Sequence, residues 1–155
     1  EAMSIMEPQL KQSGIKIETD IPSEPVLIIG DQQRLEQVII NLIRNAIDAL
    51  DDTEFPSITI SLHKNNSVKF SICDNGKGIS DLETLFEPFQ TSKDPTKGLG
   101  LGLAISSNII SELGGSLSGE NITPRGAEFT IKLPLFDPSR VNVVEDKQTK
   151  MNEKL

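Results

Sequence analysis

NLIRNAIDAL, residues 41–50, closes the longest periodic segment of the chain, which begins at Asp31. Apolar residues recur along this segment at spacings of three and four, the pattern of a helix that buries one broad face. Asp31 follows a glycine and has the side chain of a typical helix N-cap. The sequence therefore predicts a long amphipathic helix over residues 31–50.

The polar side of this helix carries Asn41, Arg44, Asn45 and Asp48, which share one stripe because they lie at i, i+3, i+4 and i+7. Asparagine is a poor helix former, so two of them in mid-helix need a reason. Neutral amide oxygens suit Mg²⁺ where phosphate supplies the negative charge, and Arg44 could contact a phosphate directly. The alternative is an ordinary solvated helix face, which the stripe taken alone favours.

A first glycine cluster lies in DNGKGI, residues 74–79, directly after an apolar strand pattern. Asp74 at that strand end could accept a hydrogen bond from an exocyclic amino group at the bottom of an apolar pocket. Gly76 and Gly78 permit positive φ and a close backbone approach. A simple turn that closes the strand explains the same residues equally well.

A second cluster lies in GLGLGLAIS, residues 98–106, where three glycines lead into a helical pattern. Free N–H groups at a helix start bind anions, and glycines let a phosphate approach them. The spacing fits neither a P-loop nor a Rossmann fingerprint. A flexible hinge without a ligand is the alternative.

Composition limits the remaining possibilities. The chain has 155 residues, a net charge of −8 and a single cysteine, Cys73. One domain is the expectation for this length. The acidic balance argues against nucleic acid as a partner, and one cysteine excludes an internal disulfide. No apolar run approaches the roughly 18 residues that cross a bilayer.

The order of the elements predicts an α+β fold, a two-layer α/β sandwich with helices on one face of a mixed sheet. We expect residues 1–14 to form a helix that could join a missing domain, residues 15–137 to form the domain itself, and residues 138–155 to be a polar tail. The other expected elements are a strand over 15–20, a short buried strand over 26–29, a hairpin over 58–73, a helix from 102 and strands over 116–121 and 127–134.

Four blocks of this chain resemble the conserved boxes of one family. NLIRNAIDAL is similar to the N box, DNGKGI to the G1 box, LFEPFQTSK to the F box and GLGLGLAIS to the G2 box of the catalytic, ATP-binding domain of sensor histidine kinases. That domain belongs to the wider superfamily of gyrase-like, chaperone-like and mismatch-repair ATPases. The resemblance runs from about Ile15 to Pro134 and implies a Bergerat-type fold with a long ATP lid. Within the family, the nitrogen-regulation and C4-dicarboxylate sensors look most similar.

The resemblance also assigns roles to residues. It implies Asn45 as the Mg²⁺ ligand, Asn41 and Arg44 as catalytic residues beside the phosphates, and Asp74 as the reader of the adenine amino group. Phe86 and Phe89 would anchor the lid, and Lys93 and Lys97 are candidate lid cations. The further expected contacts of ATP are Gly76, Gly78, Ile79, Phe89, Thr91, Lys97, Gly98, Leu99, Gly100, Leu101, Gly102, Leu103 and Thr130.

One position separates the subfamilies. ATP-hydrolysing relatives carry a glutamate where this chain has Asn41, and an amide cannot take a proton from water. The resemblance therefore implies transfer of the γ-phosphoryl group to a protein histidine rather than hydrolysis. His63, the only histidine, lies in a predicted hairpin strand, whereas the family's phosphoacceptor histidine lies on a separate helical domain.

The implied partners are a missing dimerisation domain that bears the histidine and the receiver domain of a response regulator. We expect a homodimeric parent protein, a cytoplasmic catalytic domain and an inner-membrane sensor as the parent. Two alternatives stay open: a serine kinase of the anti-sigma-factor type, and a non-catalytic nucleotide-binding module.

Overall fold

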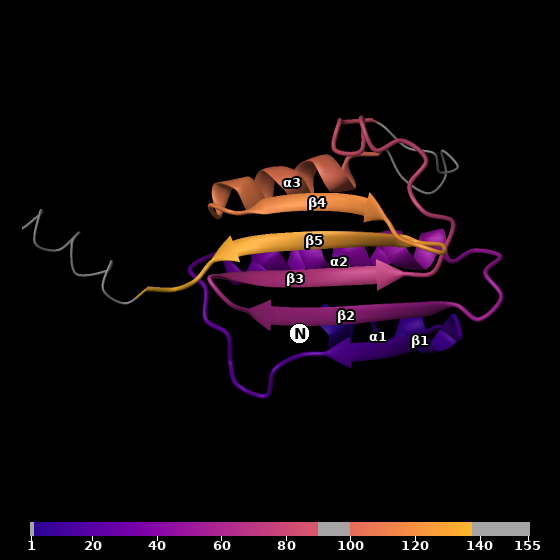
Figure 1. Ribbon diagram of the computed structural model, residues 1–155, viewed down its shortest axis with the longest axis horizontal. Coiled ribbons are helices and arrows are strands. Elements are labelled where there is room, and N and C mark those ends of the chain that lie inside the picture. Colours follow the sequence, from indigo (N-terminus) through magenta and orange to yellow (C-terminus); the bar gives the residue numbers. More distant parts are fainter. Residues whose placement is uncertain (1, 90–99, 138–155) are drawn as a thin grey trace, which may run out of the picture.

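The computed structural model describes residues 2–89 and 100–137 as three helices and five strands (Figure 1). In chain order these elements are α1 (Ala2–Gln12), β1 (Lys16–Asp20), α2 (Gln32–Ala49), β2 (Ser57–Lys64), β3 (Ser67–Asp74), α3 (Gly102–Glu112), β4 (Ser116–Asn121) and β5 (Ala127–Pro134).

The strands form one sheet in the order β1-β2-β3-β5-β4. β1 runs parallel to β2, while the other neighbours are antiparallel, so the sheet is mixed. In Figure 1, α1 and α2 lie behind the strands and α3 lies along the β4 edge; α2 packs against both other helices, and together they cover one face of the sheet. The predicted two-layer α+β architecture is therefore confirmed.

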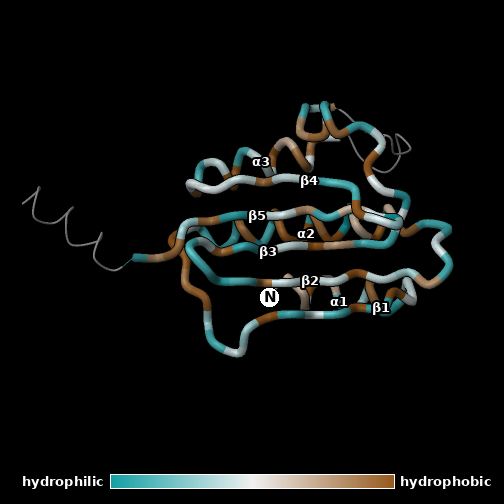
Figure 2. The backbone as a smooth tube through the Cα atoms, viewed as in Figure 1, coloured by the Kyte–Doolittle hydropathy of each residue, from teal (hydrophilic) through white to brown (hydrophobic). Residues whose placement is uncertain are grey.

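The core lies between that sheet face and α2. Alternate residues of each strand point toward the helices, such as Ile58 and Ile60 in β2 and Ile72 in β3. The apolar face of α2 meets them with Val38 and Leu42, both fully buried. Figure 2 shows the same alternation, with apolar and polar segments interleaved along the helices and strands. The spacing that predicted the long helix is thus the spacing that fills the core.

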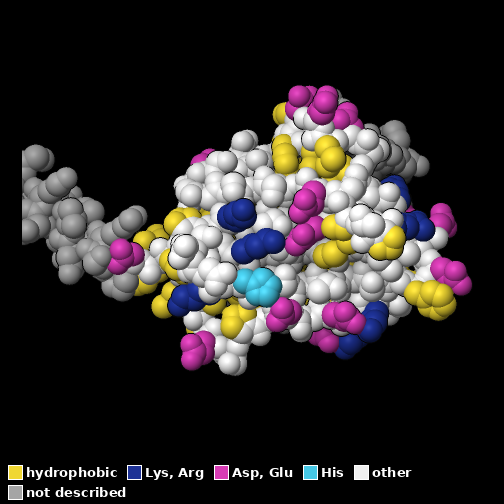
Figure 3. Space-filling model, in the orientation of Figure 1, with side chains coloured by type: hydrophobic (Ala, Val, Ile, Leu, Met, Phe, Trp, Pro, Cys, Tyr) yellow, Lys and Arg dark blue, Asp and Glu magenta, His cyan; other side chains and the backbone are white. Residues whose placement is uncertain are grey.

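The opposite face of the sheet is polar and uncovered by any described element, and Figure 3 looks onto it. Lys69, Glu128 and Lys132 project there, with a 3.8 Å ion pair between Lys69 and Glu128. Ser71 and Thr130 are buried among them and share a 3.4 Å contact between their hydroxyls. Half of the residues of each central strand therefore take no part in the core.

α1 belongs to the same core as the rest of the domain. Its Met6 and Leu10 are 2% and 3% exposed and pack in the main apolar cluster. α1 therefore packs together with the sheet and α2. Among residues 2–89 and 100–137, no helix is both long and apolar enough to span a bilayer.

The strand expected over residues 26–29 is wrong. This segment alternates, since Val26 and Ile28 pack against the core while Leu27 and Ile29 are 63% and 65% exposed. It forms no ladder with the sheet, although the N–H of Phe136 donates to the carbonyl of Leu27 over 3.3 Å. The apolar run was therefore half-buried chain and not a buried strand.

Candidate functional site

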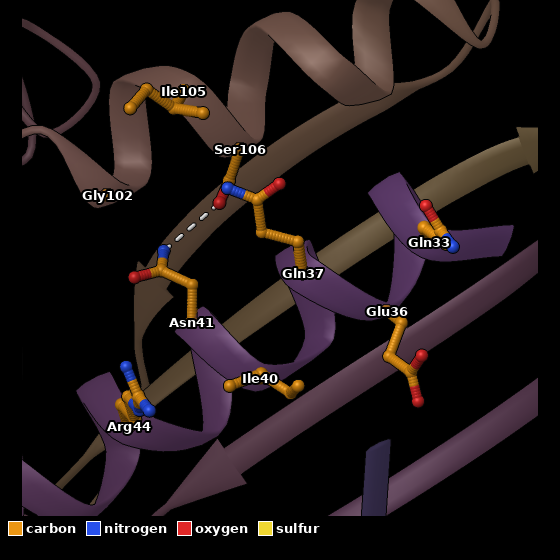
Figure 4. Close-up of a pocket in the computed structure, with 9 residues that line it drawn as sticks. All are labelled: Gln33, Glu36, Gln37, Ile40, Asn41, Arg44, Gly102, Ile105 and Ser106. Atoms are coloured by element: carbon orange, nitrogen blue, oxygen red, sulfur yellow. Dashed lines mark hydrogen bonds between the residues drawn. The ribbon is translucent and has the colours of Figure 1, made fainter. Parts of the chain in front are cut away.

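Two residues of the polar stripe of α2, Asn41 and Arg44, face the beginning of α3 across a groove (Figure 4), whereas Asn45 and Asp48 do not line it. The groove has a volume of about 360 Å³ and is lined from α2 by Asn41 and Arg44, and from α3 by Gly102, Ile105 and Ser106. Two sequence segments some sixty residues apart therefore meet, as the resemblance implied. Gln33, Glu36, Gln37 and Ile40 complete the lining.

Asn41 is held in a fixed orientation at this meeting point. Its Nδ2 donates to Ser106 Oγ over 3.0 Å, the dashed line in Figure 4. Its Oδ1 lies only 2.3 Å from where a Cβ on Gly102 would stand. A larger residue at position 102 would therefore displace the Asn41 side chain from this orientation.

The two long helices differ at their N-termini. Asp31 caps α2, because its carboxylate accepts from the N–H of Arg34 over 3.1 Å. At α3 the N-cap position is Leu101, which makes no side-chain cap. Within the described part of the chain no side chain at the N-cap position bonds the first N–H groups of α3, and the helix dipole there favours an anion.

Asp74 marks the other end of the site, at the last residue of β3. Its side chain is 2% exposed, and its Oδ1 accepts from the N–H of Gly76 over 2.8 Å. Burial raises the pKa of this carboxyl above its ordinary value, while hydrogen bonds from the Gly76 and Ala127 backbone oppose the rise. No lysine or arginine in the described part of the chain forms an ion pair with Asp74. A buried carboxylate in this condition is suited to a neutral donor such as an amino group.

The loop after Asp74 packs against the C-terminal end of α2. The N–H of Lys77 donates to the carbonyl of Ala49 over 3.1 Å, and a Cβ on Gly76 would lie 2.2 Å from that carbonyl. Gly78 has a φ of +79°, a conformation that glycine adopts freely. The same helix therefore contacts the loop at Ala49 and carries Asn41 roughly 12 Å away along its axis, since a helix rises 1.5 Å per residue.

The F-box segment connects these two ends. Phe86 packs against the core, whereas Phe89 is 71% exposed, so Phe89 does not anchor by packing. Instead the N–H of Phe89 donates to the carbonyl of Gly100 over 3.1 Å, with a φ of +64° at Phe89 and +70° at Gly100. The predicted contacts Thr91, Lys97, Gly98 and Leu99, together with Lys93, lie outside the described residues.

Thr130 is a wrong prediction. Asp74 is paired with Ala127 on the helix-covered face, and Thr130 lies three residues further along β5, on the opposite face. Its hydroxyl meets Ser71 there. Leu103 and Ile79 both pack against the core, Ile79 within the loop that follows Asp74.

The sequence did not predict two residues that hold other parts of the site, Ser106 and Asn121. Ser106 lies in the apolar pattern of α3 and is 2% exposed, so a buried serine among apolar residues was the available signal. Asn121, at the end of β4, bonds to both backbone groups of Ile79. Nothing in its local sequence indicated that contact, because the partner is 42 residues away.

The donor set fits a metal only together with phosphate. Among the residues that the structure describes, no three histidine, cysteine or carboxylate side chains gather to hold a cation. Asn45 lies one helical turn after Asn41 and offers a neutral amide oxygen. A hard cation such as Mg²⁺ takes few protein ligands when it arrives with substrate phosphates, and this stripe suits that arrangement.

Comparisons with known proteins agree on one family. The model described as "Histidine kinase-, DNA gyrase B-, and HSP90-like ATPase" matches residues 30–137. The two-component sensor PprA of Pseudomonas aeruginosa is 36% identical over 148 residues, or 89% of this chain and 16% of that protein. The C4-dicarboxylate transport sensor protein DctB of Rhizobium meliloti is 42% identical over 120 residues, or 76% of this chain and 19% of that protein. The chain thus spans under a fifth of the length of these two relatives.

Solved structures give the same result. The nucleotide-free catalytic domain of histidine kinase ThkA is similar with a TM-score of 0.75 and 31% identity, over 86% of this chain and 89% of that one. ThkA in complex with the response regulator protein TrrA is similar with a TM-score of 0.72 and 28% identity, over 87% of this chain and 38% of that one.

Proposed function

The chain belongs to the family of histidine kinase-, DNA gyrase B- and HSP90-like ATPases and is an ATP-binding kinase domain of the histidine kinase type. We propose that its parent protein transfers the γ-phosphoryl group of ATP to a histidine on a separate dimerisation domain. The observation that carries this proposal is the groove in which Asn41 and Arg44 of α2 face the uncapped start of α3.

We assign the base of ATP to the Asp74 end of the site. The carboxylate of Asp74 accepts from the exocyclic amino group of adenine, which guanine replaces with a carbonyl oxygen. The triphosphate then runs along α2 toward the N–H groups at the start of α3, where Arg44 adds a positive charge. The two chemical ends of the nucleotide therefore match the two ends of the site.

Asn45, on the same face of α2, would hold Mg²⁺ together with the phosphates of the nucleotide. Bound there, Mg²⁺ would neutralise negative charge on the phosphates. The chain's own residues orient the groups around it: Ser106 fixes the amide of Asn41, and Gly102 leaves the room that this amide needs.

The chemistry of Asn41 supports transfer rather than hydrolysis. Its amide has no basic site that could take a proton from water at neutral pH. His63 is not the acceptor, because it projects from the hairpin on the polar sheet face, away from the groove between α2 and α3. Its Nε2 lies there 3.7 Å from Oδ2 of Asp20. The acceptor histidine therefore comes from another domain. We infer that this domain works in the cytoplasm of a homodimeric parent sensor and that a response regulator receives the phosphoryl group, as the ThkA–TrrA complex suggests by analogy.

Calorimetry with Mg-ATP tests the site. Asn45→Ala and Asp74→Ala are each expected to raise the dissociation constant about tenfold or more, the effect of a lost charge-assisted bond. Asn66→Ala, in the exposed turn between β2 and β3, is the matched control and should bind like the unaltered chain. Unchanged affinity in both site variants would remove the proposed site.

Phosphoryl transfer is tested separately with γ-labelled ATP. The chain alone should take up no label and release little phosphate, whereas adding a histidine-bearing dimerisation domain from a related sensor should give a labelled product. Label on a serine of a partner, or rapid phosphate release by the chain alone, would reject the histidine kinase assignment.

A further inference from the structure

The loop after Asp74 is fastened to the turn between β4 and β5, first of all by the side chain of Asn121 at the end of β4. Asn121 accepts from the N–H of Ile79 over 2.6 Å and donates its Nδ2 to the carbonyl of the same residue over 2.9 Å. A side-chain amide here replaces the pairing that a neighbouring strand would give, so both backbone groups of Ile79 are satisfied outside the sheet. A residue that makes two such bonds fixes the position and the direction of the loop.

Further contacts from the same turn hold the same loop. Nε of Arg125 donates to the carbonyl of Gly76 over 3.0 Å. The Asn121 oxygen lies 2.8 Å from where a Cβ on Gly78 would stand, so the turn also excludes a side chain at that residue. Gly126 packs so closely that its Cβ would meet the carbonyl of Asp74 at 1.9 Å. The β4–β5 turn therefore forms the support on which the loop rests.

On the other side of the loop, a second side-chain amide, that of Asn75, bonds two backbone groups in the same way. Asn75 accepts from the N–H of Ser57 over 2.8 Å and donates to the carbonyl of Phe55 over 2.9 Å. The loop is thus fastened on one side by Asn75 and on the other by Asn121. Asn75 belongs to the loop itself, whereas Asn121 reaches it from another strand, so Asn121 can be changed without altering the loop's own sequence.

We propose that Asn121 is a positioning residue for the base of the nucleotide, which presets the loop from Gly76 to Ile79 as a rigid wall beside Asp74. The inference rests on the proposed function, since it assigns the base to this end of the site. Asn121 lies in the same row across the sheet as Ala127 and Asp74, on the helix-covered face. A wall that is already ordered does not have to be ordered when the ligand binds, which strengthens binding without a new contact.

The prediction distinguishes the two ends of the ligand. Asn121→Ala should weaken binding of Mg-ATP about tenfold, because two hydrogen bonds that hold the base wall are lost. Binding of inorganic tripolyphosphate with Mg²⁺, which has no base, should stay unchanged. Asn121→Asp keeps an acceptor for the Ile79 N–H but loses the donor, so its affinity for Mg-ATP should lie between that of the unaltered chain and that of Asn121→Ala. Asn66→Ala should behave as the unaltered chain for both ligands.

Hydrogen exchange at the Ile79 amide gives a readout that needs no nucleotide. The amide should exchange slowly in the unaltered chain and in Asn121→Asp, and quickly in Asn121→Ala. Asn121 is exposed, so all variants should unfold near the temperature of the unaltered chain.

Three results would overturn the inference. If the unaltered chain bound no Mg-ATP, the proposed function would fail together with it. If Asp74→Ala lost affinity for Mg-ATP while Asn121→Ala kept it, the site would stand and the role of Asn121 would be refuted. Equal losses for Mg-ATP and tripolyphosphate in Asn121→Ala would reduce Asn121 to a general structural residue.

Discussion

Gly102→Ala puts a methyl group into the space that Asn41 occupies. The new Cβ would lie 2.3 Å from the Asn41 Oδ1 and 3.0 Å from its Cγ. These distances are too short for non-bonded atoms, which pack at roughly 3.5–4.0 Å. The Asn41 side chain must therefore rotate away and give up its 3.0 Å bond to Ser106.

The effects on stability nearly cancel. Loss of the bond costs about 1 kcal/mol. Alanine at the start of α3 regains up to about 1 kcal/mol over glycine, because its backbone has less freedom in the unfolded chain. The free energy of unfolding should therefore change by no more than about 1 kcal/mol. The affinity for Mg-ATP should fall about tenfold, since Asn41 no longer points at the phosphate end.

Urea unfolding and calorimetry measure the two quantities on the same protein. Gly30→Ala is the matched control, because its new Cβ would meet only the terminal Cδ2 of Leu113, at 3.0 Å, and that side chain can move. The control should keep both its stability and its affinity. Normal nucleotide affinity in Gly102→Ala would refute the reasoning, as would an equal loss of affinity in Gly30→Ala.

Three further predictions concern the site and the core. Ser106→Ala removes the acceptor of the Asn41 amide hydrogen bond. Phosphoryl transfer to a supplied histidine-bearing domain should therefore slow several-fold in single-turnover labelling, while the dissociation constant for Mg-ATP should change little. Ser106→Thr should restore the rate of transfer. Because burial raises the pKa of Asp74, calorimetry over a pH series should show the affinity for Mg-ATP falling as the pH drops through that raised value and the carboxylate is neutralised. The folded chain holds this proton more tightly than the unfolded chain does, so its free energy of unfolding relative to Asp74→Asn should rise over the same fall in pH, and a difference that is independent of pH would contradict the pKa shift. Ile110→Ala, at a fully buried position of α3, should lower the free energy of unfolding by about 2–5 kcal/mol in urea titrations, and a much smaller loss would mean that the core tolerates a cavity there.

The parts of the fold that the sequence predicted are those with strong local patterns. α2 repeats its apolar residues over five turns and is preceded by Asp31, whose capping bond to Arg34 is present. The β2–β3 hairpin alternates on both strands, and its register places Ile60 opposite Ile72. In both cases the local pattern and the tertiary packing require the same conformation.

The failures came where a distant partner decides the outcome. Val26 to Ile29 alternate much as a strand does, but β1 takes the place beside β2 in the sheet. Thr130 has a plausible side chain for a nucleotide contact, and only its register against β3 shows that it faces away from Asp74. Local sequence does not contain either fact.

The site was predicted in the same uneven way. Asn41, Arg44 and Gly102 came from motifs, and the structure brings them together in one groove. Ser106 and Asn121 act across 65 and 42 residues of chain, on Asn41 and Ile79 respectively. Their contributions are contacts to other protein groups, which no short motif encodes.

The hydrogen bond between Phe89 and Gly100 has a consequence for engineering. It joins the two points at which the intervening ten residues leave and re-enter the described fold. The link uses backbone atoms at both ends, so a substitution at Phe89 that keeps the N–H leaves the donor in place. Phe89→Pro would remove that N–H and with it the direct connection between the end of the Phe86 segment and the start of α3.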